Sequence, residues 1–333
     1  MRAEQNKAAG RLRAQDAATD WSMNGKTVLF TGATRGMGRF AAIELARRGA
    51  DILVVGHNDA RGAAAVEAIR ATGSSSEFLR ADMGDAAEVC ALAKAVLARH
   101  ERIGVLIHSA GGLQPSAART REGVDRGFAQ NFLGAFLLTR LLEERLLASA
   151  PARVIAVGSA AHKFVKKVDL DAVMRPRKAQ MSSFQKGNYQ MLSYQVAKLA
   201  VTTWIYGLAR RWAGRGVTAN VLDPGLVKGA FGEHFEAPAP IRLVMNHVAP
   251  FFLATRPERG SEQYVRLATD PTLANVSGMY FVSGKEKKEC SSPLSLDPAV
   301  QKRIEDVAEA WAAPFLAADS WPSARMRTKG AES

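Results

Sequence analysis

Thr31-Gly32-Ala33-Thr34-Arg35-Gly36-Met37-Gly38 is the most informative stretch of the sequence. It follows a short β-prone run at 26–30 and precedes 40–48, where apolar residues recur at helical spacing. Glycines let a backbone turn sharply and approach a pyrophosphate, and the N-terminus of the next helix offers unpaired N–H groups to that anion. The spacing Gly-x3-Gly-x-Gly in this context therefore predicts a dinucleotide-binding turn. The alternative is a turn that only reverses the chain.

Beyond this turn, apolar runs alternate with helical patterns along the chain. The expected strands are 26–30, 52–55, 77–81, 105–107, 153–157, 217–222 and 279–282. The expected helices are 40–48, 59–72, 85–99, 123–149, 188–212 and 304–311. Strands separated by helices of this length form parallel βαβ units, and continuously apolar strands fit a sheet covered on both faces. The sequence predicts an α/β fold, a single doubly wound domain of the Rossmann type with a seven-stranded parallel sheet.

Tails and long insertions set the limits of this domain. Residues 1–22 and 321–333 have the composition of polar tails, so the domain is expected to span 23–320. Two long segments, 160–187 and 226–255, follow strand C-termini, where open α/β sheets bind ligands. The apolar residues of the second segment include Met245, Val248, Phe251, Phe252 and Leu253. They predict a substrate lid over a hydrophobic molecule, with plain core packing as the alternative.

Charge and cysteine content narrow the function classes. The chain has 45 Lys and Arg against 32 Asp and Glu, a formal net charge of +13. The basic residues are dispersed and no nucleic-acid module accompanies them, so we expect no nucleic-acid partner. Cys90 and Cys290 form neither a disulfide framework nor a metal pattern, so no metal is expected and a reducing, cytoplasmic compartment fits. We also expect neither a signal peptide nor a transmembrane helix.

A second motif lies on the apolar helix expected at 188–212. Tyr194 and Lys198 are four residues apart and would share one face of that helix. A neighbouring ammonium group can lower the pKa of a phenol, and such a phenol can exchange a proton with a carbinol oxygen. The alternative is a tyrosine and a lysine that are neighbours only by chance.

Both motifs resemble the TGxxxGxG and YxxxK signatures of the short-chain dehydrogenase/reductase family. The resemblance covers about residues 24–315 and is closest to the retinol-dehydrogenase-like branch, whose C-terminal pattern resembles 268–271 and 276–281. It implies an oxidoreductase that interconverts a carbonyl and an alcohol. Ser159 corresponds to the family's catalytic serine, and Asn131 to the asparagine of its water-mediated proton relay. The catalytic set implied by the resemblance is Asn131, Ser159, Tyr194 and Lys198.

The cofactor contacts follow from the same resemblance. Asp82, beside Met83, corresponds to the acid that contacts the adenine. In His108-Ser109 two asparagines usual in the family are replaced, which leaves open how the hydrogen bonds of that turn are made. Val227 matches the position whose backbone contacts the carboxamide. The implied cofactor-binding set is Gly32, Thr34, Arg35, Gly36, Met37, Gly38, His57, Asp82, Met83, Ala110, Gly111, Tyr194, Lys198, Pro224, Gly225 and Val227.

The choice of cofactor depends on the end of the second strand. Val54-Val55-Gly56-His57-Asn58 contains no acid that would bind the ribose hydroxyls and repel a 2′-phosphate. Arg35 supplies a guanidinium suited to a phosphate, and His57, where the branch tends to have arginine, can donate a hydrogen bond. The sequence favours NADP(H) over NAD(H), with a merely solvated Arg35 as the alternative.

The substrate and partners are less sharply indicated. An apolar small molecule is expected, and a steroid, a retinoid-like terpenoid, a polyketide or a fatty aldehyde would all fit. The basic cluster from Lys163 to Lys178 could meet an anionic group or only solvent. The family implies a homo-oligomer built on the helices 123–149 and 188–212, and the lid could provide peripheral membrane contact. The competing function is a non-catalytic NADP(H)-binding scaffold or sensor.

Overall fold

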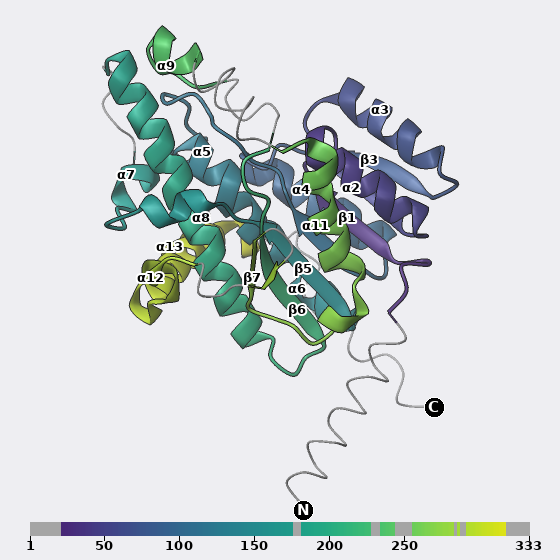
Figure 1. The fold of residues 1–333 in the computed structure, drawn as a ribbon. Helices are drawn as coiled ribbons and strands as arrows, with labels where there is room; N and C mark the ends of the chain where they lie inside the picture. The colour runs from purple at the N-terminus through teal and green to yellow at the C-terminus, as the bar shows by residue number, and fades with distance from the viewer. Residues whose placement is uncertain are drawn as a thin grey trace, which may run out of the picture.

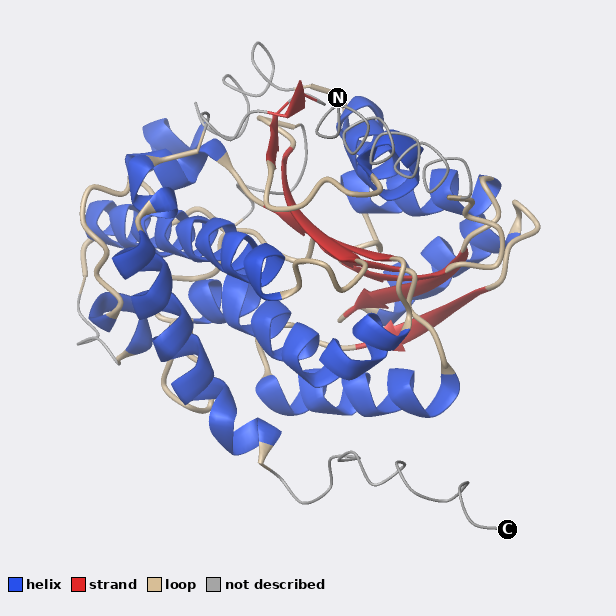
Figure 2. Cartoon of the chain, turned by 90° about the horizontal axis from the view of Figure 1, so that it is seen from below, coloured by secondary structure: helices blue, strands red, loops and turns tan. Residues whose placement is uncertain are grey.

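A twisted sheet with helices on both faces forms the protein (Figures 1 and 2). The computed structural model describes residues 21–175, 181–227, 234–243, 255–282, 285–286 and 291–317. The strand order in this part of the chain is β3-β2-β1-β4-β5-β6-β7-β8. The strands are β1 (Thr27–Thr31), β2 (Asp51–Gly56), β3 (Ser76–Arg80), β4 (Val105–His108), β5 (Ala152–Val157), β6 (Val217–Asp223), β7 (Tyr280–Val282) and β8 (Lys285–Glu286).

The prediction of seven parallel strands is confirmed for β1 to β7. The sequence reading missed β8, a two-residue strand that pairs antiparallel with β7. The chain builds outward from β1 to β3 on one side and from β4 to β7 on the other, so the order reverses between β1 and β4. Ligands of open α/β sheets bind at such a switch point, beyond the carboxyl ends of the strands. Thr31 and His108 are paired at this point.

Two helical layers enclose the sheet, because alternate strand side chains point to opposite faces. One layer contains α2 (Gly36–Arg47), α3 (Asp59–Arg70) and α11 (Pro257–Thr269). Figure 1 shows α11 beside α2, far apart in sequence. The other layer contains α4 (Ala86–Arg99), α6 (Gly134–Ala148), α8 (Ser183–Arg211) and α13 (Pro298–Leu316). Val28 and Phe30 face the first layer and Leu29 faces the second, and all three are fully buried.

Two of the long helices differ from the sequence expectation. The helix expected at 123–149 is divided into α5 (Arg126–Phe128), a π-turn η1 (Ala129–Leu133) and α6. Such π-turns are frequent at functional sites, and this one contains Asn131. Helix α8 begins at Ser183, five residues before the expected start, because Ser182 and Gln185 form a capping box.

Shorter elements complete the described chain. They are the 3₁₀ turns η2 (Ala160–Phe164) and η5 (Pro271–Leu273) and the short helices α7 (Asp171–Met174), α9 (Ala239–Leu243) and α12 (Pro293–Leu296). The predicted lid residues Met245, Val248, Phe251, Phe252 and Leu253 lie outside the described residues. None of the described helices combines the length and apolarity that crossing a bilayer requires.

Trp21, the first described residue, packs against the rest of the protein. Trp21, assigned to the tail by the sequence, donates a hydrogen bond from Nε1 to the Ala268 carbonyl, at 2.8 Å. Its ring lies under the Arg153 guanidinium, 4.0 Å from the centroid, and under the Lys26 ammonium, at 4.3 Å. Cation–π contacts of this kind hold an aromatic ring in place. Trp21 therefore belongs to the folded domain.

Candidate active site

The glycine-rich turn lies between β1 and α2 with little space around its backbone. Gly32 has φ +78°, and a Cβ there would lie 2.7 Å from the Ala110 nitrogen, so only glycine fits. Its N–H donates to the Val55 carbonyl at 2.9 Å. Helix α2 starts at Gly36, with Arg35 as its exposed N-cap residue. The turn therefore presents the N–H groups of Gly36, Met37 and Gly38 at a helix N-terminus, where an anion is favoured.

The end of β3, which β2 separates from β1 in the sheet, carries the predicted adenine contact. Asp82 accepts a 2.8 Å hydrogen bond from the Gly84 N–H, and it forms an ion pair with Arg126 on α5. Met83 is buried, and its carbonyl faces Gly134, where a Cβ would lie 2.0 Å away. This close approach fixes the start of α6 against the end of β3. Sequence reasoning did not find Arg126, because nothing in its spacing points to Asp82.

The end of β4 shows how the two replaced asparagines are compensated. His108 is buried on the α6 side, and its Nε2 lies 2.8 Å from the Thr139 hydroxyl. The Ser109 hydroxyl lies 2.7 Å from the Tyr264 hydroxyl on α11. Thr31 Oγ1 accepts from the N–H groups of Ser109 and Ala110, at 3.1 and 3.3 Å. Different side chains thus hold the turn that leads to Ala110 and Gly111.

Asn131 connects the π-turn to the segment after β4. Its Nδ2 donates to the carbonyls of Gly112 and Gly127, at 2.8 and 2.7 Å, and its Oδ1 accepts from the Gly112 N–H at 3.1 Å. Both amide hydrogens are therefore in use, and only a lone pair of Oδ1 remains for a proton path. A Cβ on Gly111 would lie 2.4 Å from Asn131 Oδ1 and 3.8 Å from Lys198 Nζ. Gly111 thus lies against both side chains.

Tyr194 and Ser159 meet across the gap between α8 and the end of β5. The Ser159 hydroxyl forms a hydrogen bond with the Tyr194 phenol. Burial raises the pKa of Tyr194 to about 12, the hydrogen bond with Ser159 opposes this rise, and the negative charge of Asp223 adds to it. Loss of hydration thus outweighs the favourable contacts of the phenolate, and the lowering of this pKa by Lys198 stays a prediction.

Lys198 is one helical turn from Tyr194 and almost completely buried, with 5% of its surface exposed. Its Nζ donates to the Val157 carbonyl at 2.9 Å and lies 5.5 Å from the centroid of the Tyr194 ring. Burial lowers the pKa of Lys198 to about 8, against the charge of Asp223, which acts in the opposite direction. The amine is therefore mostly protonated at neutral pH. An ammonium has three donors, and Val157 is its one hydrogen-bond acceptor among the described residues.

The end of β6 contributes a buried carboxylate that was not among the predicted site residues. Asp223 accepts from the Gly225 N–H at 2.9 Å and from the Tyr280 hydroxyl at 2.7 Å. These bonds fix the Pro224-Gly225 turn. Val227 follows and forms a parallel bridge with Thr255, whose N–H donates to the Leu226 carbonyl at 2.9 Å.

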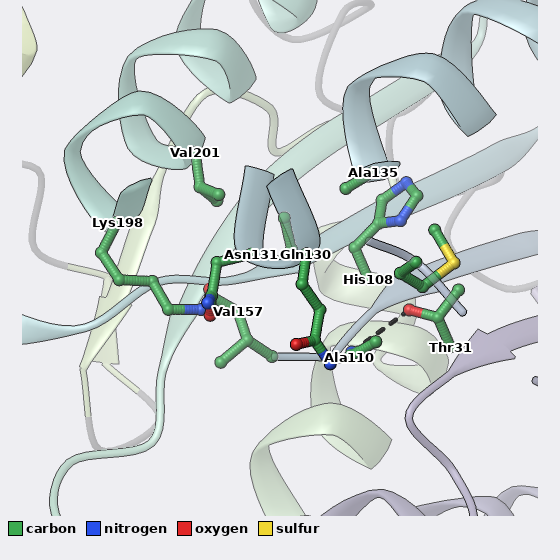
Figure 3. A pocket seen from close by; sticks show the side chains of 11 residues that line it. Thr31, His108, Ala110, Gln130, Asn131, Ala135, Val157, Lys198 and Val201 are labelled. Carbon is green, nitrogen blue, oxygen red and sulfur yellow. Dashed lines mark hydrogen bonds between the residues drawn. The ribbon is translucent and has the colours of Figure 1, made fainter. Parts of the chain in front are cut away.

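Residues from the two halves of the sheet meet at one pocket, shown in Figure 3. The Lys198 amine points toward Asn131 there, while His108 lies on the opposite wall. The pocket is lined by Thr31, Met83, His108, Ala110, Gln130, Asn131, Ala135, Ala156, Val157, Lys198 and Val201. The structure thus brings together residues predicted for catalysis and residues predicted for cofactor binding.

The described residues fit a nicotinamide dinucleotide. The helix N-terminus at Gly36 suits its pyrophosphate, and Lys198 has donors left for a ribose hydroxyl. His57 is exposed at the end of β2, on the same edge of the sheet as Arg35. In the described part of the chain no three His, Cys, Asp or Glu side chains are grouped to bind a metal.

Comparisons with known proteins agree with this arrangement. The family model for short chain dehydrogenases matches residues 26–168. Human retinol dehydrogenase 14 is 33% identical over 302 residues, covering 86% of each protein. Human retinol dehydrogenase 13 is 32% identical over 286 residues, covering 84% of this chain and 82% of that protein.

Solved structures show the same fold. A Beutenbergia cavernae protein assigned as an NAD(P)-dependent gluconate 5-dehydrogenase, solved with bound NADP at low occupancy, superimposes with a TM-score of 0.61. It is 27% identical, and the match covers 79% of this chain and 96% of that protein. From the glycine turn, the parallel sheet and these similarities together, the chain belongs to the short-chain dehydrogenase family, in its retinol-dehydrogenase-like branch.

Proposed function

We propose that this oxidoreductase uses NADP(H) to interconvert a carbonyl and an alcohol on an apolar small molecule. The observation that carries the proposal is the Tyr194 phenol with the buried Lys198 ammonium 5.5 Å from its ring and with Ser159 acting on the phenol. A phenol with an adjacent hydroxyl can move a proton to or from a carbinol oxygen, which a passive binding protein does not need.

Tyr194 is in its protonated form, which is the form that carbonyl reduction requires. A phenol with a pKa of about 12 is protonated at neutral pH, so it can donate to an alkoxide that develops on the substrate. When the substrate binds, the single hydroxyl hydrogen of Ser159 turns from Tyr194 to this oxygen and stabilises its charge. The bound nicotinamide supplies the hydride chemistry.

Lys198 and Asn131 orient the site rather than transfer the proton directly. The Lys198 ammonium is fixed by the Val157 carbonyl and carries a positive charge toward the phenol and the cofactor ribose. Asn131 holds the backbone of Gly112, and with it the segment that adjoins the ribose position. The resulting geometry keeps the reacting groups in place before substrate arrives.

The preference for NADP(H) rests on charge near the adenosine ribose. Arg35 is exposed at the N-cap of α2, and β2 ends at Gly56 and His57 without an acid. A guanidinium favours a 2′-phosphate, and no carboxylate at this strand end repels it. The NADP bound to the Beutenbergia cavernae protein is consistent with this preference.

The test is consumption of NADPH and NADH with long-chain aldehydes, polyene aldehydes and steroid ketones, for wild type and Tyr194→Phe. We expect NADPH oxidation with at least one of these substrates, and a loss of roughly a thousandfold in kcat in the variant. NADPH binding, followed by fluorescence, should change less than about twofold.

Tyr189→Phe is the matched control, because it removes another α8 phenol, one that donates to the Ala172 carbonyl. It should keep kcat within about threefold of wild type. Full turnover in Tyr194→Phe would rule out the proposed proton donor. Tight NADPH binding with no turnover of any carbonyl would favour the scaffold function instead.

A further inference from the structure

His162 occupies a fully buried position between the predicted catalytic serine and the C-terminal part of the chain. It lies in η2, three residues after Ser159. Its Nδ1 is 2.6 Å from the Ser159 carbonyl oxygen, and its Nε2 is 3.0 Å from the Ser292 nitrogen. Its ring packs against Tyr280, with centroids 5.2 Å apart. None of the roles derived above uses this side chain.

The two hydrogen bonds determine the tautomer of the ring. The backbone N–H of Ser292 can only donate, so Nε2 of His162 accepts. A neutral imidazole has one N–H, which must then be on Nδ1 and must donate to the Ser159 carbonyl. Burial lowers the pKa of His162, and Lys163 acts in the same direction, whereas the Ser159 hydrogen bond and Asp223 oppose it. The neutral ring is consistent with this pattern.

Ser159 is consequently held from several sides. Its carbonyl accepts from His162 Nδ1 and from the His162 backbone N–H, at 2.6 and 3.1 Å. Its Oγ accepts from the Ala161 N–H at 3.2 Å. The hydroxyl hydrogen is then the part of the side chain that is left to point toward Tyr194. The rotamer of Ser159 depends on the shape of this 3₁₀ turn, which His162 fixes.

The anchor on the other side of His162 is itself well ordered by hydrogen bonds. Ser292 caps α12 through the Ser295 N–H, at 3.2 Å. Ser291 and Ser295 share a 2.7 Å hydrogen bond, and the Tyr206 hydroxyl on α8 donates to Ser291 at 2.8 Å. Helix α8 also carries Tyr194, so this network ties the η2 turn to the helix on which Tyr194 lies.

We propose that His162, as the Nδ1–H tautomer, is a positioning residue that holds the Ser159 hydroxyl in line with Tyr194 by tying the η2 turn to Ser292. This inference rests on the proposed function, in which Ser159 and Tyr194 act on the substrate oxygen.

The tautomer can be measured without any activity. Nitrogen-15 NMR of the six histidines, with the His162 signals assigned by their loss in His162→Asn, distinguishes a protonated Nδ1 from a protonated Nε2. We expect the Nδ1–H form in the cofactor-free protein at neutral pH. An Nε2–H or doubly protonated ring would overturn the inference.

Two substitutions of His162 each keep one of its two hydrogen bonds and remove the other. An asparagine amide nitrogen can take the place of Nδ1, so His162→Asn keeps a donor for the Ser159 carbonyl. A glutamine amide reaches the place of Nε2, so His162→Gln keeps the bond to Ser292 and loses the one to Ser159. A purely structural role predicts that both variants lose kcat in proportion to their loss of thermal stability.

A positioning role predicts a different pattern. His162→Gln should lower kcat about tenfold or more while KM for NADPH stays within about twofold, because the reacting groups are misplaced but the cofactor site is intact. His162→Asn should retain kcat within about threefold, even if its Tm falls further. Equal kcat in the two variants would overturn the inference. If the wild type turns over none of the carbonyls, the proposed function fails. The inference about His162 is then tested only by the NMR measurement of its tautomer.

Discussion

Two buried cations at opposite ends of β5 show how similar groups serve different purposes. Lys198 is bound to the carbonyl of Val157, the last residue of the strand, and Arg153 lies near its first residue. They are 5% and 3% exposed. Arg153 donates to the carbonyls of Leu267 and Asp270, at 2.8 and 2.9 Å, and stacks on Trp21.

The difference lies in the place of the unused donors, because Arg153 also has a buried Nε without a hydrogen-bond partner among the described residues. Arg153 binds two carbonyls and an aromatic face, and thereby joins β5 to α11 and the N-terminal segment. Lys198 binds one carbonyl among the described residues, at the edge of the sheet where ligands bind. Burial of a charge therefore does not mark an active site by itself. Donors left unused at the carboxyl edge are the more specific sign.

The sharpest test of this comparison replaces each cation by methionine. In Lys198→Met we expect kcat to fall by at least about a hundredfold, because a preorganised charge next to the phenol is lost. Its unfolding free energy should stay within about 1 kcal/mol of wild type, since burial already disfavours this ammonium. Steady-state kinetics and urea unfolding followed by circular dichroism give the two values.

Arg153→Met should show the reverse pattern. We expect a loss of about 3 kcal/mol of stability, because the carbonyls of Leu267 and Asp270 lose their donor inside the protein. At a temperature where the variant is folded, kcat should remain within about threefold of wild type. A variant of Arg153 that is stable but inactive would contradict the division between the two ends of the strand.

His108 extends this comparison to a third buried group. It lies at the carboxyl edge of the sheet, and only one of its two ring nitrogens has a hydrogen-bond partner in the described part of the chain. Its Nε2 contacts Thr139, whereas its Nδ1 has no hydrogen-bond partner within the described residues. Burial lowers the pKa of His108 from 6.5 to about 3. The unfolded chain therefore takes up this proton at higher pH than the folded protein does, and stability falls as pH drops from 6.5 toward 3.

The expected slope for this one group approaches about 1.4 kcal/mol per pH unit below pH 6.5. His108→Gln, which can still reach Thr139, should remove that part of the slope. Urea midpoints of both proteins at pH 6.5, 5.5 and 4.5 measure the difference, since other titrating groups contribute equally. Parallel pH dependence in the two proteins would show that His108 is not a buried neutral ring.

The smallest effect concerns Trp21, which packs against Arg153 at the start of β5. Trp21→Phe keeps a ring for Arg153 and Lys26 but loses the hydrogen bond to the Ala268 carbonyl, so we expect a loss of about 1 kcal/mol. Trp311→Phe is the matched control, because the Trp311 Nε1 is buried without a partner in the described part of the chain. Thermal unfolding should rank Trp21→Phe below Trp311→Phe, and the opposite order would contradict the anchoring role.

Features that depend on neighbouring residues could be predicted from the sequence, whereas features that depend on contacts between distant residues could not. Strands such as β5 and β6 were located within a residue, because continuous apolar runs are local signals. The π-turn around Asn131 was missed, since helical periodicity does not reveal one extra residue per turn.

Long-range contacts explain the rest of the differences. His162 follows Ser159 by three residues, yet its partner Ser292 is 130 positions away. The raised pKa of Tyr194 depends on burial among several elements, which a motif on one helix does not contain. The sequence placed the candidate residues, and the packing determined their protonation.

The bridge between Val227 and Thr255 has a consequence for engineering. The Thr255 N–H binds the Leu226 carbonyl, so the two ends of the segment between them are held together at the carboxyl edge of the sheet. The entropy of closing a loop depends only weakly on loop length once its ends are joined. Residues 234–243 within this segment also contact the rest of the domain, because Glu236 accepts from the Ser116 N–H and donates its own N–H to Gln190. A segment grafted from a relative between Leu226 and Thr255 should therefore keep these contacts if it is to change substrate range and leave the site intact.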